Sequence, residues 1–265
     1  MKAPVLLITN ADDFGLSHAV NTEVERLHVL GVLSSATVMA NGAAVEEVPD
    51  IQRRNPGLGL GVHLNATNFK AFTPRMRSSR LCDDAGNFNS GFRDHHHVGL
   101  TRMLVEEWTA QIEFLQSLGL VIDHIDSHHH VHTWPSALPA LLQVCKQTGI
   151  HWVRNTRNLV PDAERAGMRG RMKYSGKSLW TKACRLAGLD LTKGFCSVHD
   201  FRQLSPVLGS LTASPSTLEL MCHPGDFGHV EYVEECSWME NELPQLLGDG
   251  FQLMSYSALA QRRER

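Results

Sequence analysis

The chain alternates short apolar runs with longer segments in which apolar residues recur every three or four positions. The first pattern predicts buried strands and the second predicts amphipathic helices. Strands are predicted at 5–8, 35–40, 58–62, 120–125, 150–154, 218–222 and 251–254, and helices at 17–30, 43–54, 101–118, 135–148, 203–212 and 231–247. The alternation favours a single (β/α) barrel of parallel strands, TIM-like and incomplete or distorted, over an open sheet.

Two stretches depart from this rhythm. Residues 66–98 hold few periodic apolar positions, and a loop of this length is usually functional or mobile. Within it, His95-His96-His97 suggests a second metal site, but a solvated cluster is the better interpretation because no strand carries an accompanying carboxylate. Residues 156–196 are hard to assign, apart from one helix expected in the basic run from 165 to 182. We expect residues 1–265 to form one domain with a long loop at about 66–98.

The composition is that of an ordinary globular protein, with 42% apolar and 20% charged residues. A net charge of −3 gives no general attraction to nucleic acid, and the basic residues 262–265 are expected to form a solvated tail. No apolar run approaches the ~20 residues that span a bilayer. The six cysteines form no C-x-x-C pair, which favours reduced, buried thiols. Because no signal peptide precedes the first apolar run, we expect a cytoplasmic protein.

Groups able to bind metal follow four of the predicted strands. They are Asp12-Asp13, His63, the run from His128 to His132, and His223. If the strands are parallel, these groups meet at one edge of the sheet, where α/β proteins bind ligands. Two or three imidazoles with one carboxylate suit Zn²⁺, Mn²⁺, Fe²⁺ or Co²⁺. A spare carboxylate and a spare histidine then provide the base and the acid that metal-assisted hydrolysis requires.

Each of these groups also has a structural interpretation. An Asp-Asp pair is common in turns, and a lone His63 is more often a hydrogen-bonded core or rim residue. His223-Pro224-Gly225 could be only a turn, and Cys222 could be a core thiol or a thiolate ligand. Trp134 and Trp152 could stack on a sugar face, although packing is the commoner use of tryptophan. Four imidazoles among five residues are harder to explain this way, because each would have to stay uncharged and hydrogen-bonded.

Four motifs resemble those of the YdjC-type carbohydrate deacetylases, a family that includes chitooligosaccharide deacetylases and hopanoid-biosynthesis-associated deacetylases. The motifs are Asn10-Ala11-Asp12-Asp13-Phe14-Gly15-Leu16, Gly61-Val62-His63, Asp126-Ser127-His128-His129-His130-Val131-His132 and Met221-Cys222-His223-Pro224. The resemblance implies a (β/α) barrel of the glycoside hydrolase/deacetylase type. It implies an enzyme that removes the acetyl group of an N-acetylated sugar. It also implies one divalent metal ion, Mg²⁺ or Zn²⁺.

The resemblance assigns roles to five residues. It implies that Asp13, His63 and His128 bind the metal. Asp12 would be the general base that activates water, and His223 the general acid for the leaving amine. A base works best with a pKa near the working pH. For Asp12 this requires burial beside Asp13 to raise the pKa from about 3.9, against the opposite pull of the metal.

Further residues have supporting roles in this interpretation. Asp126 is expected to orient a metal ligand through a hydrogen bond, and His132 is the second choice to His128 as a ligand. Arg154 and Trp134 are candidate contacts to a ligand or a substrate. The segment 66–98 is expected to shape the substrate cleft. The expected partner is a small N-acetylated sugar, and the oligomeric state stays open between a monomer and a homodimer.

Two other functions are compatible with the same groups. A metal-dependent phosphoesterase would need basic residues near the cleft, and Arg154 is the only obvious candidate at a strand end. A catalytically inactive sugar-binding or metal-binding protein would lack the base or the acid. Because both Asp12 and His223 are present, the sequence favours an enzyme.

Overall fold

The computed structural model describes residues 4–89, 99–157, 159, 167–202, 216–225, 228–247 and 250–263. Its eight strands form one sheet in the order β5-β4-β3-β2-β1-β7-β6, and β8 pairs with β1. Every strand pair is parallel. The strands are β1 (Val5–Phe14), β2 (Ser35–Val38), β3 (Gly59–Leu64), β4 (His124–Ser127), β5 (Trp152–Val153), β6 (Gly194–Ser197), β7 (Thr217–Cys222) and β8 (Phe251–Leu253).

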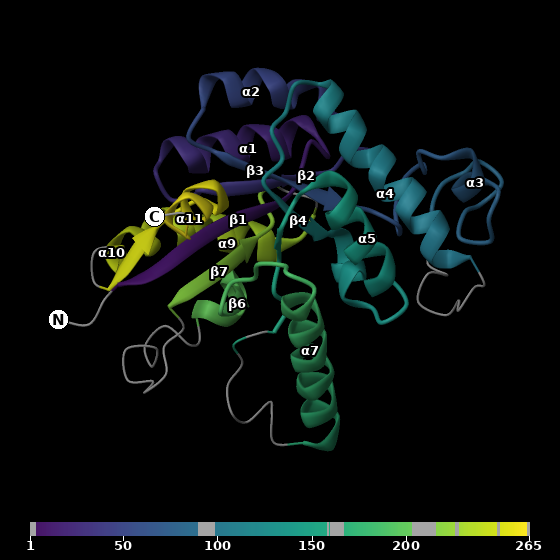
Figure 1. Cartoon of the computed structure of the whole chain (residues 1–265). Coiled ribbons are helices and arrows are strands. Elements are labelled where there is room, and N and C mark those ends of the chain that lie inside the picture. Colours follow the sequence, from purple (N-terminus) through teal and green to yellow (C-terminus); the bar gives the residue numbers. More distant parts are fainter. Residues whose placement is uncertain are drawn as a thin grey trace.

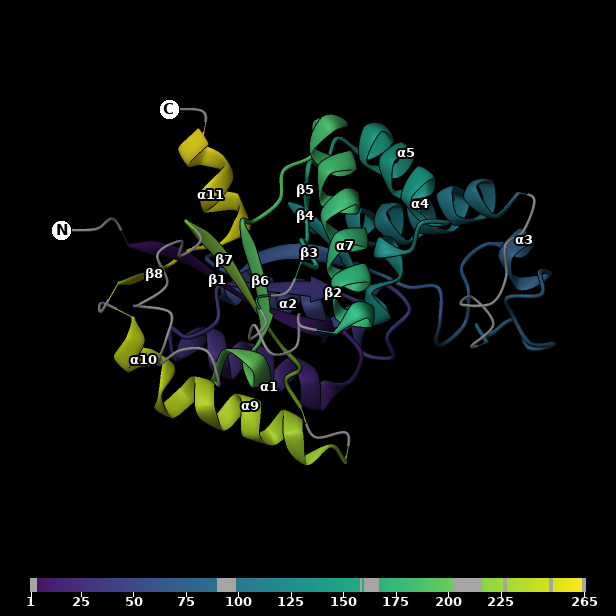
Figure 2. The same ribbon diagram turned by 90° about the horizontal axis from the view of Figure 1, so that it is seen from below.

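Helices surround this curled sheet (Figures 1 and 2). They are α1 (His18–Val29), η1 (Val45–Glu47), α2 (Val48–Arg54), α3 (Pro74–Arg77), α4 (Leu100–Ser117), η3 (His128–Thr133), α5 (Leu138–Thr148), α7 (Met168–Leu186), α9 (Val230–Asn241), α10 (Leu243–Leu246) and α11 (Tyr256–Arg263). Buried apolar residues from the strands and these helices form the main core. Parallel β–α alternation with a curled sheet confirms the predicted (β/α) barrel in an incomplete form, with β5 and β6 at its edges in the part of the chain described.

Some of the predicted elements differ from the structure. The fourth strand begins at His124, not at 120, because Val121 is 75% exposed and pairing with β3 matches His63 to Asp126. The predicted helix 231–247 is divided into α9 and α10, the second with a proline in its first turn. Sequence analysis missed β6 and also α11, which extends to Arg263. Arg262 is exposed, as expected for a solvated tail. The predicted helix 203–212 lies outside the described residues.

The inner face of the sheet is polar and closely packed. Gly61 on β3 is required there, because a Cβ at this position would lie 2.6 Å from the ring of His124 on the neighbouring strand. The His124 ring in turn stacks on Tyr256 of α11, with 4.0 Å between the ring centroids. Tyr256 and Leu259 pack against Ile8 and Trp152 in a small apolar cluster. Helix α11 thus fills the end of the barrel opposite to the carboxyl ends of the strands.

The segment from 66 to 89 is folded and joined to the core. Met76 and Leu81 are fully buried in the main apolar cluster. The buried Glu107 of α4 accepts hydrogen bonds from the backbone N–H groups of Phe72 and Thr73, at 2.8 and 2.9 Å. Figures 1 and 2 show α3 beside the outer end of α4, away from the sheet. This part of the predicted loop is therefore a compact extension of the domain.

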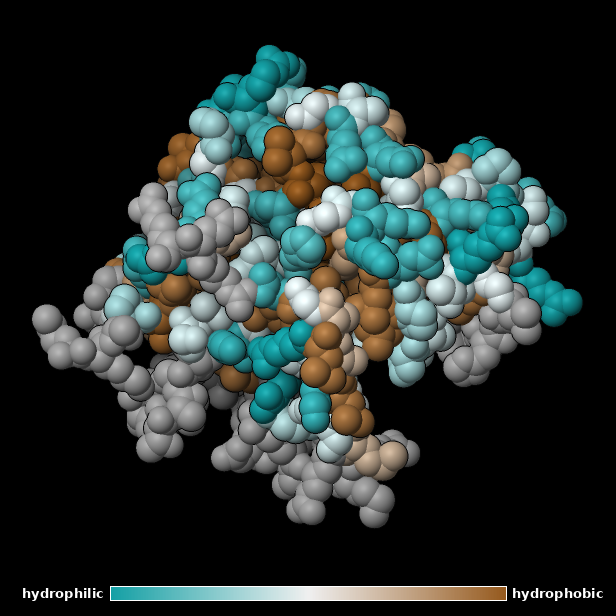
Figure 3. Space-filling view, in the orientation of Figure 1, coloured by the Kyte–Doolittle hydropathy of each residue, from teal (hydrophilic) through white to brown (hydrophobic). Residues whose placement is uncertain are grey.

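Helix α7 projects from the body of the molecule in Figure 1, and Figure 3 shows apolar surface over it. Met172 and Leu179 of this helix are each 69% exposed. All six cysteines are free, as predicted. Of the helices described, none has both the length and the apolar composition needed to cross a membrane.

Candidate active site

The site begins where β1 ends. The pairing of β1 with β2 shifts register between Ala11 and Phe14, which marks a bulge at the two aspartates. Asp13 adopts a left-handed backbone with φ of 63°, which few residues other than glycine, asparagine and aspartate adopt readily. Bulges re-aim side chains, and here Asp12 and Asp13 acquire different partners. The two carboxylates therefore diverge at this bulge, Asp13 toward His128 and Asp12 toward Arg154.

Asp13, His63 and His128 converge on one point. Asp13 Oδ1 lies 3.3 Å from His63 Nε2 and 3.0 Å from His128 Nδ1. One ligand atom from each of the three residues lies within 4.8 Å of the others. The three come from different elements, β1, β3 and η3. One carboxylate and two imidazoles form a donor set that suits a divalent transition metal such as Zn²⁺.

His63 is held in the orientation that a metal ligand needs. Its Nδ1 lies 2.7 Å from Asp126 Oδ1, which leaves Nε2 to face Asp13. Thr37 Oγ1 donates to the other oxygen of Asp126 at 3.0 Å. A carboxylate on the distal ring nitrogen fixes the tautomer and raises the basicity of a ligating histidine. The position of Asp126 therefore supports its predicted orienting role.

Asp12 is bound by a buried arginine. Arg154 donates from Nη1 to Asp12 Oδ2 at 2.8 Å and from Nη2 to Asp12 Oδ1 at 2.6 Å. Burial alone would raise the pKa of Asp12, but the Arg154 charge and its hydrogen bonds outweigh burial and lower the pKa. The raised pKa that a base at this position requires is therefore not present, and Asp12 is an ionised carboxylate of fixed orientation at neutral pH. Asp12 also forms a second group with His63 and Asp126, but a cation there would meet the Arg154 charge.

His223 lies beside a buried glutamate of α9. Its backbone N–H donates to Glu235 Oε2 at 2.9 Å, and its Nδ1 lies 3.5 Å from the same oxygen. Burial alone would lower the pKa of His223, but Glu235, with help from Asp12 and Asp13, outweighs burial and raises it. The ring stacks on Tyr232 with 4.6 Å between centroids. These contacts favour a protonated imidazole within electrostatic reach of both aspartates.

The other histidines of the run have different surroundings. His129 is exposed, and its Nδ1 lies 3.0 Å from Thr67 Oγ1. Burial, and then the nearby Arg154 charge, lower the pKa of both His130 and His132 to about 3, so both are neutral. The His132 Nδ1 bonds to Ser127 Oγ. Among the described residues, neither His130 nor His132 belongs to a group that could hold an ion, and His128 does.

The remaining sequence candidates lie away from this cluster or outside the described chain. Trp134 is half-buried against the main core, and Trp152 packs with Tyr256 at the opposite end of the barrel. The pKa of Cys222 is raised well above its usual value by burial, which keeps it a thiol and disfavours a thiolate ligand. The residues 95–97 lie outside the described part of the chain. Arg154 is fully buried among carboxylates and is not free to contact a ligand.

Sequence reasoning missed three residues of the polar network. Glu219 on β7 lies 2.7 Å from Arg154 Nε, and Tyr256 Oη donates to Glu219 at 2.5 Å. Glu235 is the partner of His223. A glutamate inside the apolar run 218–222 was a visible signal for the first of them. No local pattern distinguishes Tyr256 or Glu235, because their partners are distant in sequence.

Comparison with known proteins agrees with these motifs. The profile of the YdjC-like protein family matches residues 6–254. The chain belongs to this family. Its similarity to a carbohydrate deacetylase of Brevibacillus brevis is 38% identity over 141 residues, which span 53% of this chain and 56% of that protein. A carbohydrate deacetylase of Halalkalibacterium halodurans is 29% identical over 238 residues, or 86% of this chain and 90% of that one. The chain thus matches several of these relatives over little more than half of their own length.

Solved structures support the fold of this YdjC-like chain. One is a candidate cellobiose-phosphate cleavage protein from Enterococcus faecalis V583, with a TM-score of 0.78 at 23% identity over 97% of this chain and 99% of that one. Another is a CE4 esterase of Streptococcus mutans, with a TM-score of 0.51 at 14% identity over 95% and 86% of the two chains. At these identities the similarity concerns the fold alone.

Proposed function

We propose that this protein is a carbohydrate N-deacetylase, which hydrolyses the acetamido group of an N-acetylated sugar with the help of one divalent ion. The observation that carries the proposal is the convergence of Asp13, His63 and His128, with Asp12 and His223 close enough to influence each other's charge. Membership of the YdjC-like family and the names of the relatives support the choice of substrate class.

The proposed ligands fit a metal ion on chemical grounds. Their three donor atoms converge from separate elements, and Asp126 turns the free nitrogen of His63 toward Asp13. The hydrogen bonds from His128 and His63 outweigh burial and keep the pKa of Asp13 well below its usual value, so this carboxylate is ionised. A divalent ion held here would lower the pKa of a water molecule and polarise the amide carbonyl.

The protein's own residues would carry the proton transfers. Asp12 would accept the proton of the attacking water, and Arg154 keeps its carboxylate ionised and aligned. His223, kept protonated by Glu235, would donate to the nitrogen of the leaving amine. Separate groups whose surroundings favour an ionised base and a protonated acid are what general acid–base hydrolysis needs.

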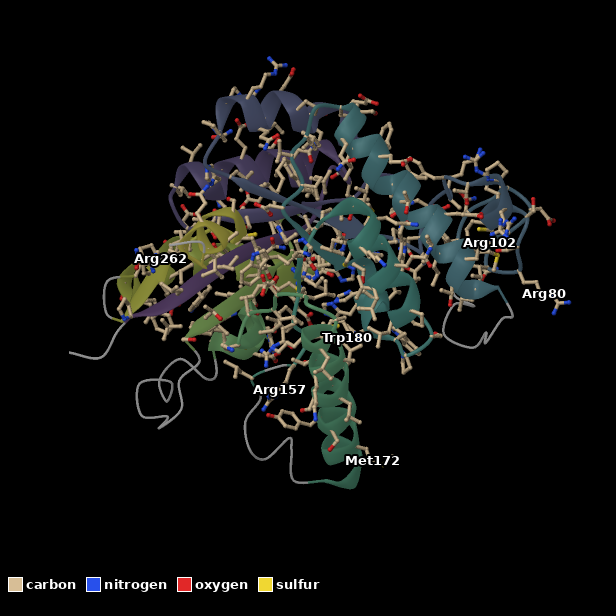
Figure 4. The ribbon with its side chains drawn as sticks, in the orientation of Figure 1. Arg80, Arg102, Arg157, Met172, Trp180 and Arg262 are labelled. Carbon is tan, nitrogen blue, oxygen red and sulfur yellow. The ribbon has the colours of Figure 1, made fainter. Side chains whose placement is uncertain are left out.

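The phosphoesterase alternative receives less support. It relied on Arg154 to bind phosphate, and each edge of that guanidinium already faces a carboxylate. Figure 4 shows Arg80, Arg102 and Arg262 at the periphery of the molecule. Arg80 lies on the segment beside α4, Arg102 on the first turn of α4 and Arg262 on α11. These three arginines and Arg154 therefore provide no phosphate site beside Asp13.

The test is acetate release from a panel of N-acetylated mono- and oligosaccharides by protein loaded with Zn²⁺, Co²⁺ or Mg²⁺. We expect at least one sugar to lose an acetyl group in mass spectra, and chelation or Asp12→Asn to abolish the loss. An aryl phosphate serves as the comparison substrate. Hydrolysis of the phosphate, with every acetylated sugar intact, would refute the deacetylase assignment.

A further inference from the structure

A fully buried chain of contacts runs from the C-terminal helix to the proposed base. Tyr256, the first residue of α11, donates from Oη to Glu219 Oε2 at 2.5 Å. Glu219 Oε1 lies 2.7 Å from Arg154 Nε. Arg154 continues the chain to both oxygens of Asp12. The side chains of Arg154 and Glu219 have no exposed surface, and Tyr256 is likewise fully buried.

The guanidinium of Arg154 is planar and rigid, so the group that holds one edge sets the direction of the other. Glu219 holds the Nε edge, while Asp12 is bound by the two terminal nitrogens. Asp126 Oδ2 contacts Nη1 at 2.7 Å, and the Phe195 ring lies 5.3 Å from the guanidinium carbon. Without Glu219, the Nε edge loses the one partner that the structure gives it among the described residues.

Stability alone is a poor explanation for this arrangement. Three carboxylates surround one guanidinium in a buried space, and burying charges of this kind often costs more than their attraction returns. Burial raises the pKa of Glu219, and the Arg154 charge and the Tyr256 hydroxyl oppose that rise. The hydroxyl therefore favours the ionised form of Glu219, which is the form that holds Arg154 Nε.

We propose that Glu219 and Tyr256 are positioning residues of the active site, which hold Arg154 so that its opposite edge aligns Asp12 for proton transfer. This assignment rests on the deacetylase function proposed above. In this proposal α11, at the opposite end of the barrel, contributes Tyr256 to the alignment of the active-site residues. Neither residue touches the substrate, because both lie buried behind Arg154.

The test compares Tyr256→Phe with two controls in steady-state assays on the metal-loaded full chain. Tyr256→Phe removes only the hydroxyl, and we expect kcat to fall roughly 10-fold, the effect of one hydrogen bond to a charged group. KM and Zn²⁺ affinity should stay within about 2-fold, since binding groups are unchanged. Tyr174→Phe removes a hydroxyl bonded to Arg157, which Figure 4 shows beside α7, and should leave kcat unchanged.

The second control separates positioning from stability. Leu259→Ala loosens α11 in the same apolar cluster without touching Glu219, so it should lower the melting temperature and preserve kcat below that temperature. Glu219→Gln adds a further comparison: combined with Tyr256→Phe, it should lower kcat no more than the more damaging single change, because both act through one chain.

Three outcomes would overturn the proposal. They are an unchanged kcat in Tyr256→Phe at full metal occupancy, an equal loss of kcat in Leu259→Ala, and strictly additive effects in the double variant. If the proposed function is wrong, the result is different: the wild-type protein releases no acetate from any sugar. The positioning assignment is then refuted as well. Active wild type with an unaffected Tyr256→Phe variant would refute the positioning assignment alone.

Discussion

Adjacent aspartates with unlike surroundings are the central feature at the residue scale. Asp13 faces two imidazoles, while Asp12 faces a guanidinium. An imidazole lone pair and a carboxylate can bind a cation together, whereas a guanidinium competes with a cation for the same oxygens. The surroundings therefore support Asp13 as the metal ligand, while Asp12 is an ionised carboxylate to which we assign the role of base by proposal.

We expect the two asparagine substitutions to separate these roles. Asp12→Asn should retain the metal and lose turnover by roughly 10²–10⁴-fold, the usual contribution of a general base. It should also destabilise the fold by about 1–3 kcal/mol, because one half of the bidentate pair with Arg154 is lost. Asp13→Asn should weaken metal binding, and excess metal should restore part of the activity. Metal content and kcat, measured on both variants, test this assignment. Loss of the metal in Asp12→Asn with retention in Asp13→Asn would mean that the two roles are exchanged.

At the scale of elements, α9 is the helix that raises the pKa of His223, the proposed acid. Its Glu235 is buried and contacts both the backbone N–H and the ring of His223. The adjacent Glu234 is exposed and pairs with Arg202 at 3.5 Å. Of these two adjacent glutamates of α9, Glu235 contacts His223 and Glu234 contacts a surface arginine instead.

This difference predicts a pH effect. A general acid must be protonated, and Glu235 contributes to the raised pKa of His223, so the protonated form persists to higher pH in wild type. Removing the carboxylate charge lowers that pKa, because the imidazolium loses its partner. The alkaline limb of kcat/KM against pH should therefore move to lower pH in Glu235→Gln and stay in place in Glu234→Gln. Identical profiles for wild type and Glu235→Gln would remove His223 from the role of acid.

At the scale of the whole molecule, the proposed metal site joins three elements. Asp13, His63 and His128 lie on β1, β3 and η3, which are separated by other segments in the sequence. A ligand that binds only the folded chain stabilises it by about 2.7 kcal/mol at one hundred times its Kd. For a chain of this length that corresponds to roughly 5–10 °C in melting temperature.

We therefore expect Zn²⁺ to raise the melting temperature of chelator-treated protein by that amount. His63→Ala should abolish the rise, because it removes a ligand from the central strand of the site. The matched control is His151→Ala, which removes an exposed imidazole directly before β5. A Zn²⁺-dependent rise that survives in His63→Ala would place the ion elsewhere.

The fold class, and the places along the chain where reactive groups occur, could be predicted from the amino-acid sequence alone. Apolar periodicity identified most strands and helices, because burial on a strand or a helix face requires it. Since parallel strands end at one edge of a sheet, the order of Asp13, His63 and His128 already implied a shared site. The motifs assigned the chain to its family without any knowledge of contacts.

The groups that set the charge and orientation of the site residues are known only from the contacts in the folded chain. The pairing of Arg154 with Asp12 joins residues 142 positions apart, and the contacts of Glu219 with Arg154 and Tyr256 also join separate segments of the chain. No local pattern records such a contact, and its effect reverses the direction of the pKa shift that the role of Asp12 as base called for. The bulge at the end of β1 is likewise a consequence of strand register. Local periodicity reports burial, whereas charge and orientation in a buried site depend on neighbours that folding brings together.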